Sequence, residues 1–206
     1  MQLIGSFNSP FARRVAVTLR HYDIAFEHRI LLTFGQFEET LKVHPLGKIP
    51  AVVLNDGRVL IDSSYILDYF DHIVGPDIAL TPLSGAGRAE VQHIVAVALG
   101  LAEKSVEYRT ETVRRPAEKL HADAVARVSR QIDAALGWLQ ARVEGSKQDC
   151  LALGRLTQAD ITTAIAVTNL LNKNLELIHA RFSPILEWAE RREVLPVFRA
   201  APFTND

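Results

Sequence analysis

Two short polar segments carry side chains suited to holding a small zwitterionic ligand. Asp62 and Ser63 come directly before an apolar pattern at helical spacing, so they are predicted to stand at a helix N-terminus. An acidic side chain and free backbone N–H groups at such a terminus can bind an amino group and a carboxylate together. Earlier in the chain, Pro50 blocks continuation of the preceding segment and leaves the backbone amide and carbonyl of Ile49 free to pair with an extended ligand. Together these residues predict a site for a small peptide.

The same residues also fit a purely structural role. Two β-prone runs, 51–54 and 58–61, flank a turn whose Asp56-Gly57 pair suits the positive φ of a tight hairpin. A hairpin followed by a capped helix is common, and Asp62 is a good N-cap whether or not a ligand binds. The choice between the two interpretations therefore depends on the rest of the chain.

The elements that must position these residues follow a β-α-β-α order before the hairpin, with one more helix after it. Residues 2–7 and 26–32 are strand candidates, and residues 36–43 form a weaker helix candidate. Between the strands, Ser9 occupies the capping position of a helix whose first residue is Pro10. A β-α-β crossover pairs strands in parallel and a hairpin pairs them antiparallel, so we expect a mixed four-stranded sheet with helices packed on it. This is the thioredoxin-like arrangement.

The character of the chain changes after a turn-rich linker. Apolar residues recur at helical spacing over residues 91–102 and again over residues 125–139, and no strand pattern or repeat is visible after residue 84. The sequence therefore predicts two domains. They are an α+β thioredoxin-like domain over residues 1–76 and an all-α helical bundle over residues 84–206.

Composition excludes several classes of protein. The 206 residues are 48% hydrophobic and 23% charged, as expected for an ordinary globular protein. Since 23 basic and 24 acidic residues give a net charge of −1, nothing indicates nucleic acid or a membrane surface as a partner. Seven histidines without metal-ligand spacing predict no metal site, and the single cysteine, Cys150, fits a reducing, cytoplasmic compartment. The N-terminus lacks a leader pattern, and no apolar run approaches the roughly 20 residues of a membrane span.

Four motifs follow one another along the chain, namely Ser9-Pro10-Phe11-Ala12-Arg13-Arg14-Val15, Pro45-Leu46-Gly47-Lys48-Ile49-Pro50-Ala51, Ile61-Asp62-Ser63 and Leu156-Thr157-Gln158-Ala159-Asp160. In this order and spacing they resemble those of soluble, cytosolic-type glutathione S-transferases, over essentially the full chain. The last motif is also typical of a helix capping box. Phe7 stands where some classes carry a catalytic tyrosine, and Ser9 stands where the thiol-exchange members carry cysteine. The resemblance is therefore to the serine-type, bacterial-like members.

The resemblance implies glutathione as cosubstrate and assigns roles to the first domain. In that family the proline matching Pro50 is cis, and the backbone of the residue matching Ile49 pairs with the cysteinyl part of glutathione. The pair matching Asp62 and Ser63 holds its γ-glutamyl end. Lys48 is either a solvated loop lysine or the partner of the glycine carboxylate. A homodimer is also implied, as is a helical domain that supplies an apolar cleft for an electrophile.

The group that activates the thiol is expected at the turn before the first helix. A thiol with an unperturbed pKa of about 8.5 is only a few per cent thiolate at neutral pH. A hydroxyl donor from Ser9 and the positive end of the helix would lower that pKa by about 2 units. Asn8 is an alternative donor, and Ser9 has a structural alternative as the N-cap. Arg13 and Arg14 are expected to be solvated or ion-paired on the same helix.

The activity that the resemblance implies is attack of the glutathione thiolate on an electrophile, which forms a thioether and serves detoxification. Two alternatives remain, because fold does not determine function. One is a non-catalytic interaction module with the same fold. The other is glutathione-dependent peroxide reduction or isomerisation, which an activated thiolate can also perform.

Overall fold

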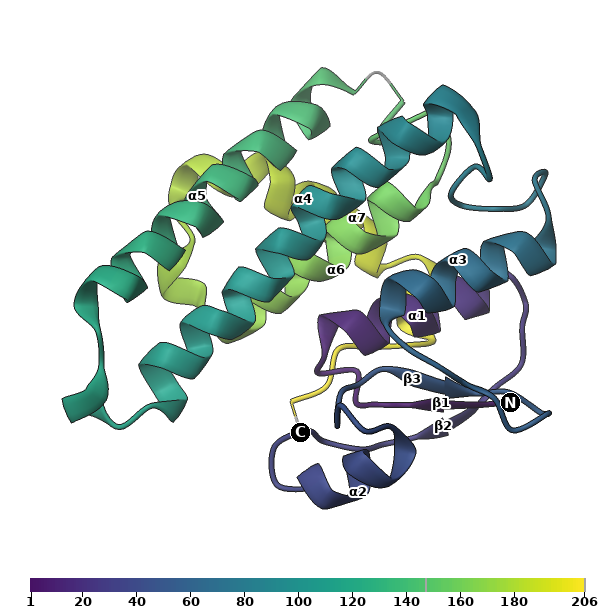
Figure 1. Cartoon of the computed structure of the whole chain (residues 1–206). Helices are drawn as coiled ribbons and strands as arrows, with labels where there is room; N and C mark the ends of the chain where they lie inside the picture. Colours follow the sequence, from purple (N-terminus) through teal and green to yellow (C-terminus); the bar gives the residue numbers. More distant parts are fainter. Residues whose placement is uncertain (147, 206) are drawn as a thin grey trace. The chain divides into compact units, whose positions relative to one another are not determined.

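The computed structural model describes residues 1–146 and 148–205, and the chain divides into two compact units (Figure 1). The first unit contains residues 1–85 together with the C-terminal residues from 194 onward. The second contains residues 86–193. The end of the chain thus folds with its beginning.

A mixed four-stranded sheet in the order β2-β1-β3-β4 forms the centre of the first unit. The strands are β1 (Gln2–Ile4), β2 (Glu27–Arg29), β3 (Ala51–Val53) and β4 (Val59–Leu60). Strand β1 runs parallel to β2 and antiparallel to β3, and β3 and β4 form an antiparallel hairpin. In its turn the Leu54 amide donates to the Arg58 carbonyl at 2.9 Å, and Gly57 has a φ of 86°. The predicted sheet and hairpin are confirmed.

Helices cover both faces of this sheet. They are α1 (Pro10–His21), α2 (Phe37–Val43) and α3 (Ser63–Val74), and α8 (Pro196–Arg199), from the end of the chain, packs against α1. Helices α1 and α3 pack together on one face, and α2 lies on the other (Figure 1). Helix α1 begins where predicted, with Ser9 as N-cap and Pro10 as the first residue, and it buries Val15 and Leu19 completely. The predicted thioredoxin-like arrangement is therefore correct.

Within the described residues, the second unit is helical. It contains most of α4 (Gly85–Arg109), then α5 (Ala122–Gly145), α6 (Gln158–Lys173) and α7 (Ser183–Glu193). Short helical turns connect them at Thr110–Arg114, Ala117–Lys119, Leu175–Leu177 and Ala180–Phe182. Helix α7 packs against both α5 and α6 and buries Trp188 completely. The prediction of an all-α C-terminal part is confirmed.

The start of α6 is held by the buried carboxylate of Asp160. This carboxylate accepts hydrogen bonds from the backbone N–H and the hydroxyl of Thr157, each at 2.8 Å, and from the Leu151 amide at 2.8 Å. Burial raises the pKa of Asp160 although these bonds favour the carboxylate form. The return of the Asp160 side chain to the start of its helix agrees with the capping box predicted from the sequence.

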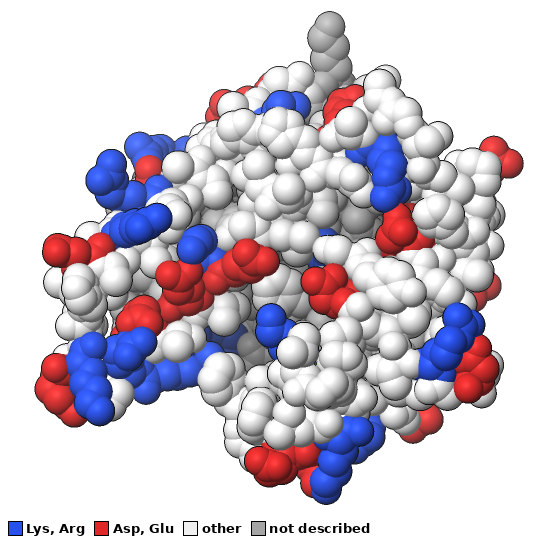
Figure 2. All heavy atoms as spheres, in the orientation of Figure 1, with Lys and Arg blue, Asp and Glu red and all other residues white. Residues whose placement is uncertain are grey.

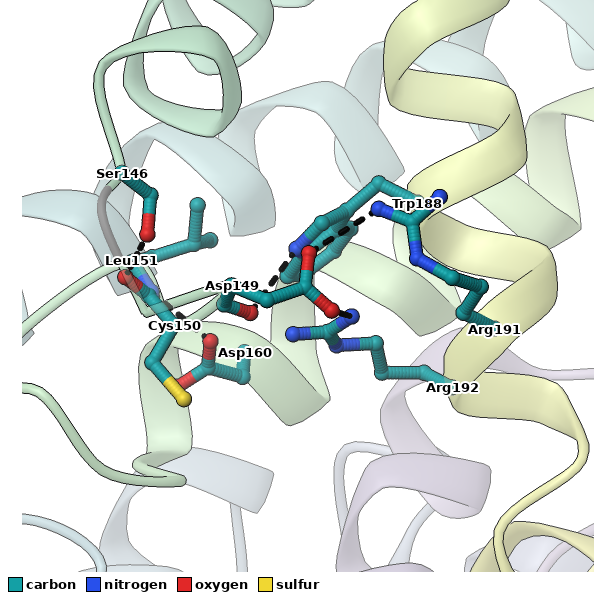
Figure 3. Close-up of polar contacts among 8 residues, drawn as sticks. All are labelled: Ser146, Asp149, Cys150, Leu151, Asp160, Trp188, Arg191 and Arg192. Atoms are coloured by element: carbon teal, nitrogen blue, oxygen red, sulfur yellow. Dashed lines mark hydrogen bonds and ion pairs between the residues drawn. The ribbon is translucent and has the colours of Figure 1, made fainter.

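The loop before α6 is tied to α7 through Asp149 (Figure 3). Arg191 and Arg192 donate to the Asp149 carboxylate at 2.9 and 2.5 Å, and their hydrogen bonds lower its pKa. The Trp188 indole N–H donates to the Asp149 carbonyl at 3.2 Å. Burial raises the pKa of the neighbouring Cys150 thiol, which disfavours its reactive thiolate form.

Charge is mixed on the face of the molecule in Figure 2, where acidic and basic side chains are interspersed. None of the helices in the described part of the chain is long and apolar enough to cross a membrane. Among the same residues there is no cluster of three or more His, Cys, Asp or Glu side chains that could hold a metal ion.

Candidate functional site

The sheet register brings the predicted segments to one edge of the first unit. Ile4 ends β1 and pairs with Ala51, which begins the antiparallel β3. The chain leaving β1 and the chain entering β3 therefore lie at the same edge. Strand β4 ends at Leu60, which pairs with Val52 near that edge, so Asp62 follows there too. The residues predicted to bind a ligand are thus gathered by the strand order alone.

Gly5 lies close to both the start of α1 and the segment before β3. A Cβ atom added to Gly5 would lie 3.2 Å from the Ile49 Cβ and 3.1 Å from the Ala12 Cβ of α1. Gly5 also has a φ of 137°, which disfavours any residue with a side chain. The start of α1 and the segment before β3 can approach this closely because the position is a glycine.

The segment that enters β3 keeps its polar groups available. The Ile49-Pro50 peptide bond is cis. Among the described residues, none forms a hydrogen bond with the backbone amide or carbonyl of Ile49. Lys48 is exposed and has no ion pair with any side chain in the described part of the chain. The Ile49 backbone can therefore pair with an extended ligand, as an added strand would.

Asp62 acts as the N-cap of α3. Its Oδ1 atom accepts hydrogen bonds from the amides of Ser64 at 2.8 Å and Tyr65 at 3.3 Å. Both bonds use Oδ1, and no described residue donates a hydrogen bond to the other oxygen, Oδ2. The Asp62 side chain is exposed. One carboxylate can thus cap the helix and still accept a hydrogen bond from an ammonium group. The structural and binding interpretations of Asp62 are compatible.

The expectation that Arg13 and Arg14 of the first helix are solvated is wrong. Their exposed fractions are 1% and 2%. Arg13 Nε donates to the Ala201 carbonyl at 2.8 Å, which binds the C-terminal segment to α1. Arg14 Nε donates to Ser63 Oγ at 3.2 Å and Arg14 Nη2 donates to Ser64 Oγ at 3.0 Å. Arg14 therefore attaches the start of α3 to α1.

Arg14 is the site residue that sequence reasoning missed. Burial lowers the pKa of Arg14 to about 10, while the negative charges of Asp62 and Asp71 act to raise it. The guanidinium therefore stays protonated at neutral pH. The sequence held one usable signal. Helix α1 contains no acidic residue, so neither arginine had an ion-pair partner on its own helix and each needed partners elsewhere.

Ser9 and Asn8 lie at the turn between β1 and α1, and both are half-buried. Ser9 Oγ accepts a hydrogen bond from the Ala12 amide at 3.4 Å. This cap uses a lone pair and leaves the hydroxyl hydrogen free to donate to an anion. The backbone N–H of Asn8 donates to Ser6 Oγ at 3.0 Å, and Ser6 Oγ lies 3.3 Å from Thr204 Oγ1. Both candidate donors thus stand at the positive end of α1.

Comparison with known proteins agrees with this geometry. The family model described as glutathione S-transferase, N-terminal domain, matches residues 3–77. An uncharacterized GST-like protein of Escherichia coli (strain K12), YibF, is 30% identical over 165 residues, which are 77% of this chain and 79% of YibF. The chain belongs to the glutathione S-transferase family.

Solved members of the glutathione S-transferase family share the fold over the whole chain. A glutathione S-transferase from Methylobacterium radiotolerans, in complex with glutathione sulfonate, has a TM-score of 0.90 and 25% identity, with 100% of this chain and 96% of that one covered. A family member from Pseudomonas fluorescens Pf-5 with bound S-(propanoic acid)-glutathione has a TM-score of 0.83 and 28% identity, with 97% of each chain covered.

Proposed function

We propose that this protein is a glutathione transferase that ionises the glutathione thiol and adds it to an electrophilic, largely apolar substrate. One observation carries the proposal. The Ile49 backbone, the Asp62 carboxylate and the Ser9 hydroxyl each keep hydrogen-bonding capacity that the described residues do not use, and all three adjoin one edge of the sheet. Glutathione offers a matching series of groups, namely an ammonium, a peptide backbone and a thiol.

Each part of glutathione has a proposed partner. Its γ-glutamyl ammonium binds the free oxygen of Asp62, and its γ-glutamyl carboxylate binds Ser63 and the amides at the start of α3. Its cysteinyl backbone pairs with Ile49, which Pro50 holds outside the sheet. Its glycine carboxylate binds Lys48, the exposed cation next to Ile49. Glutathione is thus the cosubstrate, and no step of the reaction requires a metal.

The chemistry then needs an anionic sulfur. The thiol proton is released to solvent, and the Ser9 hydroxyl or the Asn8 side chain donates a hydrogen bond to the thiolate at the N-terminus of α1. Lowering the thiol pKa by about 2 units makes thiolate the dominant form at neutral pH. The sulfur lone pair forms the new C–S bond, and the leaving group of the electrophile departs with the electron pair of the bond that breaks.

The proposal is tested by conjugation of glutathione to a generic aryl halide, after retention of the protein on immobilised glutathione. We expect Ser9→Ala to raise the pKa of bound glutathione, measured by thiolate absorbance, and to lower the rate at neutral pH about tenfold or more. Ser9→Thr, which keeps the hydroxyl, should retain most of the wild-type rate. Affinity for glutathione should change little, because most binding contacts lie between Ile49 and Ser63.

The same measurement on Asn8→Ala decides between the two donors. A rise in the bound-thiol pKa in Asn8→Ala alone would move the role to Asn8. No rise in either variant would leave the backbone amides and the dipole of α1 as the source of activation. Binding without turnover in the wild type would favour a non-catalytic module, and absence of binding would contradict the proposed function.

We also propose that the enzyme works in the reducing cytoplasm as a homodimer that detoxifies small electrophiles. The dimer follows from family membership, and the free Cys150 fits a reducing compartment. The chain has a mass of 22.9 kDa, so light scattering at micromolar concentration should report about twice that mass. A particle of monomer mass under these conditions would rule the dimer out.

A further inference from the structure

The turn that carries Ser9 is attached to strand β2 by a histidine. The ring of His28 stacks on the ring of Phe7 with a centroid distance of 4.0 Å and an interplanar angle of 5°. Its Nε2 atom lies 2.7 Å from the carbonyl oxygen of Gly5. A carbonyl can only accept a hydrogen bond, so Nε2 must carry the hydrogen. One side chain therefore holds two points of the same turn.

The Gly5 carbonyl stands just past the end of the β1–β2 ladder. The last pair in that ladder is Ile4 with Arg29, and the Gly5 amide still donates to the Arg29 carbonyl at 3.0 Å. The next acceptor, the Gly5 carbonyl, bonds to the side chain of His28 instead of to strand backbone. His28 thereby fixes the orientation of the peptide at which the chain leaves the sheet.

That peptide determines where the candidate thiol donors lie. The Ser9 amide donates to the Ser6 carbonyl at 3.1 Å, which closes a four-residue turn with Phe7 and Asn8 at its centre. Phe7 is 8% exposed and lies against the imidazole of His28. A change in the orientation of the Gly5 peptide would therefore displace both Asn8 and Ser9.

We propose that His28 is a positioning residue for thiol activation, acting through its hydrogen bond to the Gly5 carbonyl and not by contact with glutathione. The inference rests on the proposed function, because it concerns the activation of bound glutathione. It adds a positioning residue on β2, whereas the turn that carries Ser9 follows β1. A displacement of about 1 Å at a reacting group can cost a factor of up to about 100 in rate, so this contact can matter greatly for catalysis.

Two substitutions separate the two contacts of His28. His28→Phe keeps an aromatic ring against Phe7 and loses the donor, whereas His28→Gln keeps an amide N–H at a similar reach and loses the ring. We expect His28→Phe to raise the bound glutathione pKa by about one unit and to lower kcat/KM about threefold at pH 7. The loss should shrink at high pH, where the thiol is ionised in both proteins. His28→Gln should stay close to wild type.

The matched control is His72→Phe, the same substitution at an exposed histidine of α3. It should leave the bound-thiol pKa and the pH–rate profile unchanged. Melting temperatures for all variants separate positioning from folding, since general destabilisation does not move the thiol pKa of the folded fraction. If His28→Phe fails to fold, His28→Gln is compared with His28→Asn instead. The shorter amide of asparagine does not reach Gly5, so His28→Asn should raise the pKa of bound glutathione.

The positioning role would be overturned by an unshifted pKa of bound glutathione in His28→Phe, or by equal shifts in His28→Gln and His28→Phe. Thiolate formation in the wild type would still support the proposed function in either case. Failure of the wild type to bind or ionise glutathione would instead remove both. The two failures are therefore told apart by the wild-type measurement alone.

Discussion

Replacing Arg14 with methionine is expected to weaken glutathione binding at least tenfold, and replacing it with alanine should also lower the free energy of unfolding by about 3 to 5 kcal/mol. Arg14 is fully buried and donates to the hydroxyls of both Ser63 and Ser64. Hydrogen bonds to a charged group contribute about 1.5 to 3 kcal/mol each. Methionine keeps much of the volume and removes the donors, so most of the stability should remain while the start of α3 loses its attachment.

The neighbouring residue provides the control. Arg13→Met removes an equally buried guanidinium whose Nε bonds to Ala201 instead of the serines. It should reduce stability without a comparable loss of glutathione affinity. Isothermal calorimetry and chemical denaturation of the two variants measure both quantities. Equal affinities in Arg14→Met and wild type would show that Arg14 supports the fold and does not shape the binding site.

Asp62→Asn is expected to raise the glutathione dissociation constant at least tenfold while changing the free energy of unfolding little. Asparagine retains an oxygen that can cap α3, so the bonds from the Ser64 and Tyr65 amides can persist. The negative charge that would meet the glutathione ammonium is lost. Truncation of one member of a partly desolvated charge pair typically costs about 2 to 5 kcal/mol.

Asp62→Ala removes both functions and should therefore lose affinity and, in addition, about 0.5 to 2 kcal/mol of stability. Calorimetric titration with glutathione, paired with thermal unfolding of both variants, separates charge from capping. Wild-type affinity in Asp62→Asn would mean that the carboxylate serves only as a helix cap. The ammonium of glutathione would then need another partner.

Local signals were strong enough to place most elements and most of the candidate site. Ser9 before Pro10 marked the start of α1, and Gly57 marked the hairpin turn, because each residue has a conformational preference that acts within a few positions. The strand order followed from the crossover and hairpin rules. Asp62 and Ile49 could be singled out from their neighbours in the chain for the same reason.

Sequence reasoning failed at Arg14 because burial of a charge depends on residues far along the chain. Its partners, Ser63 and Ser64, are 49 and 50 positions away and meet it only when α1 packs on α3. His28 escaped notice for a similar cause, since its contacts with Gly5 and Phe7 require β2 to pair with β1. No local sequence pattern indicates contacts between residues that are far apart in the chain.

The sequence by itself therefore determined the order of elements, the helix caps and turns, the thioredoxin-like and helical parts, and the segments that carry the candidate ligand-binding groups. Each of these depends on backbone preferences and hydrophobic periodicity, which act over one or two turns of chain. Only the tertiary structure decided that the residues from 194 onward fold with the first unit, that two arginines of α1 are buried, and that His28 holds the turn before Ser9. These features arise from packing between distant segments, whose energies depend on which surfaces meet and not on local preference.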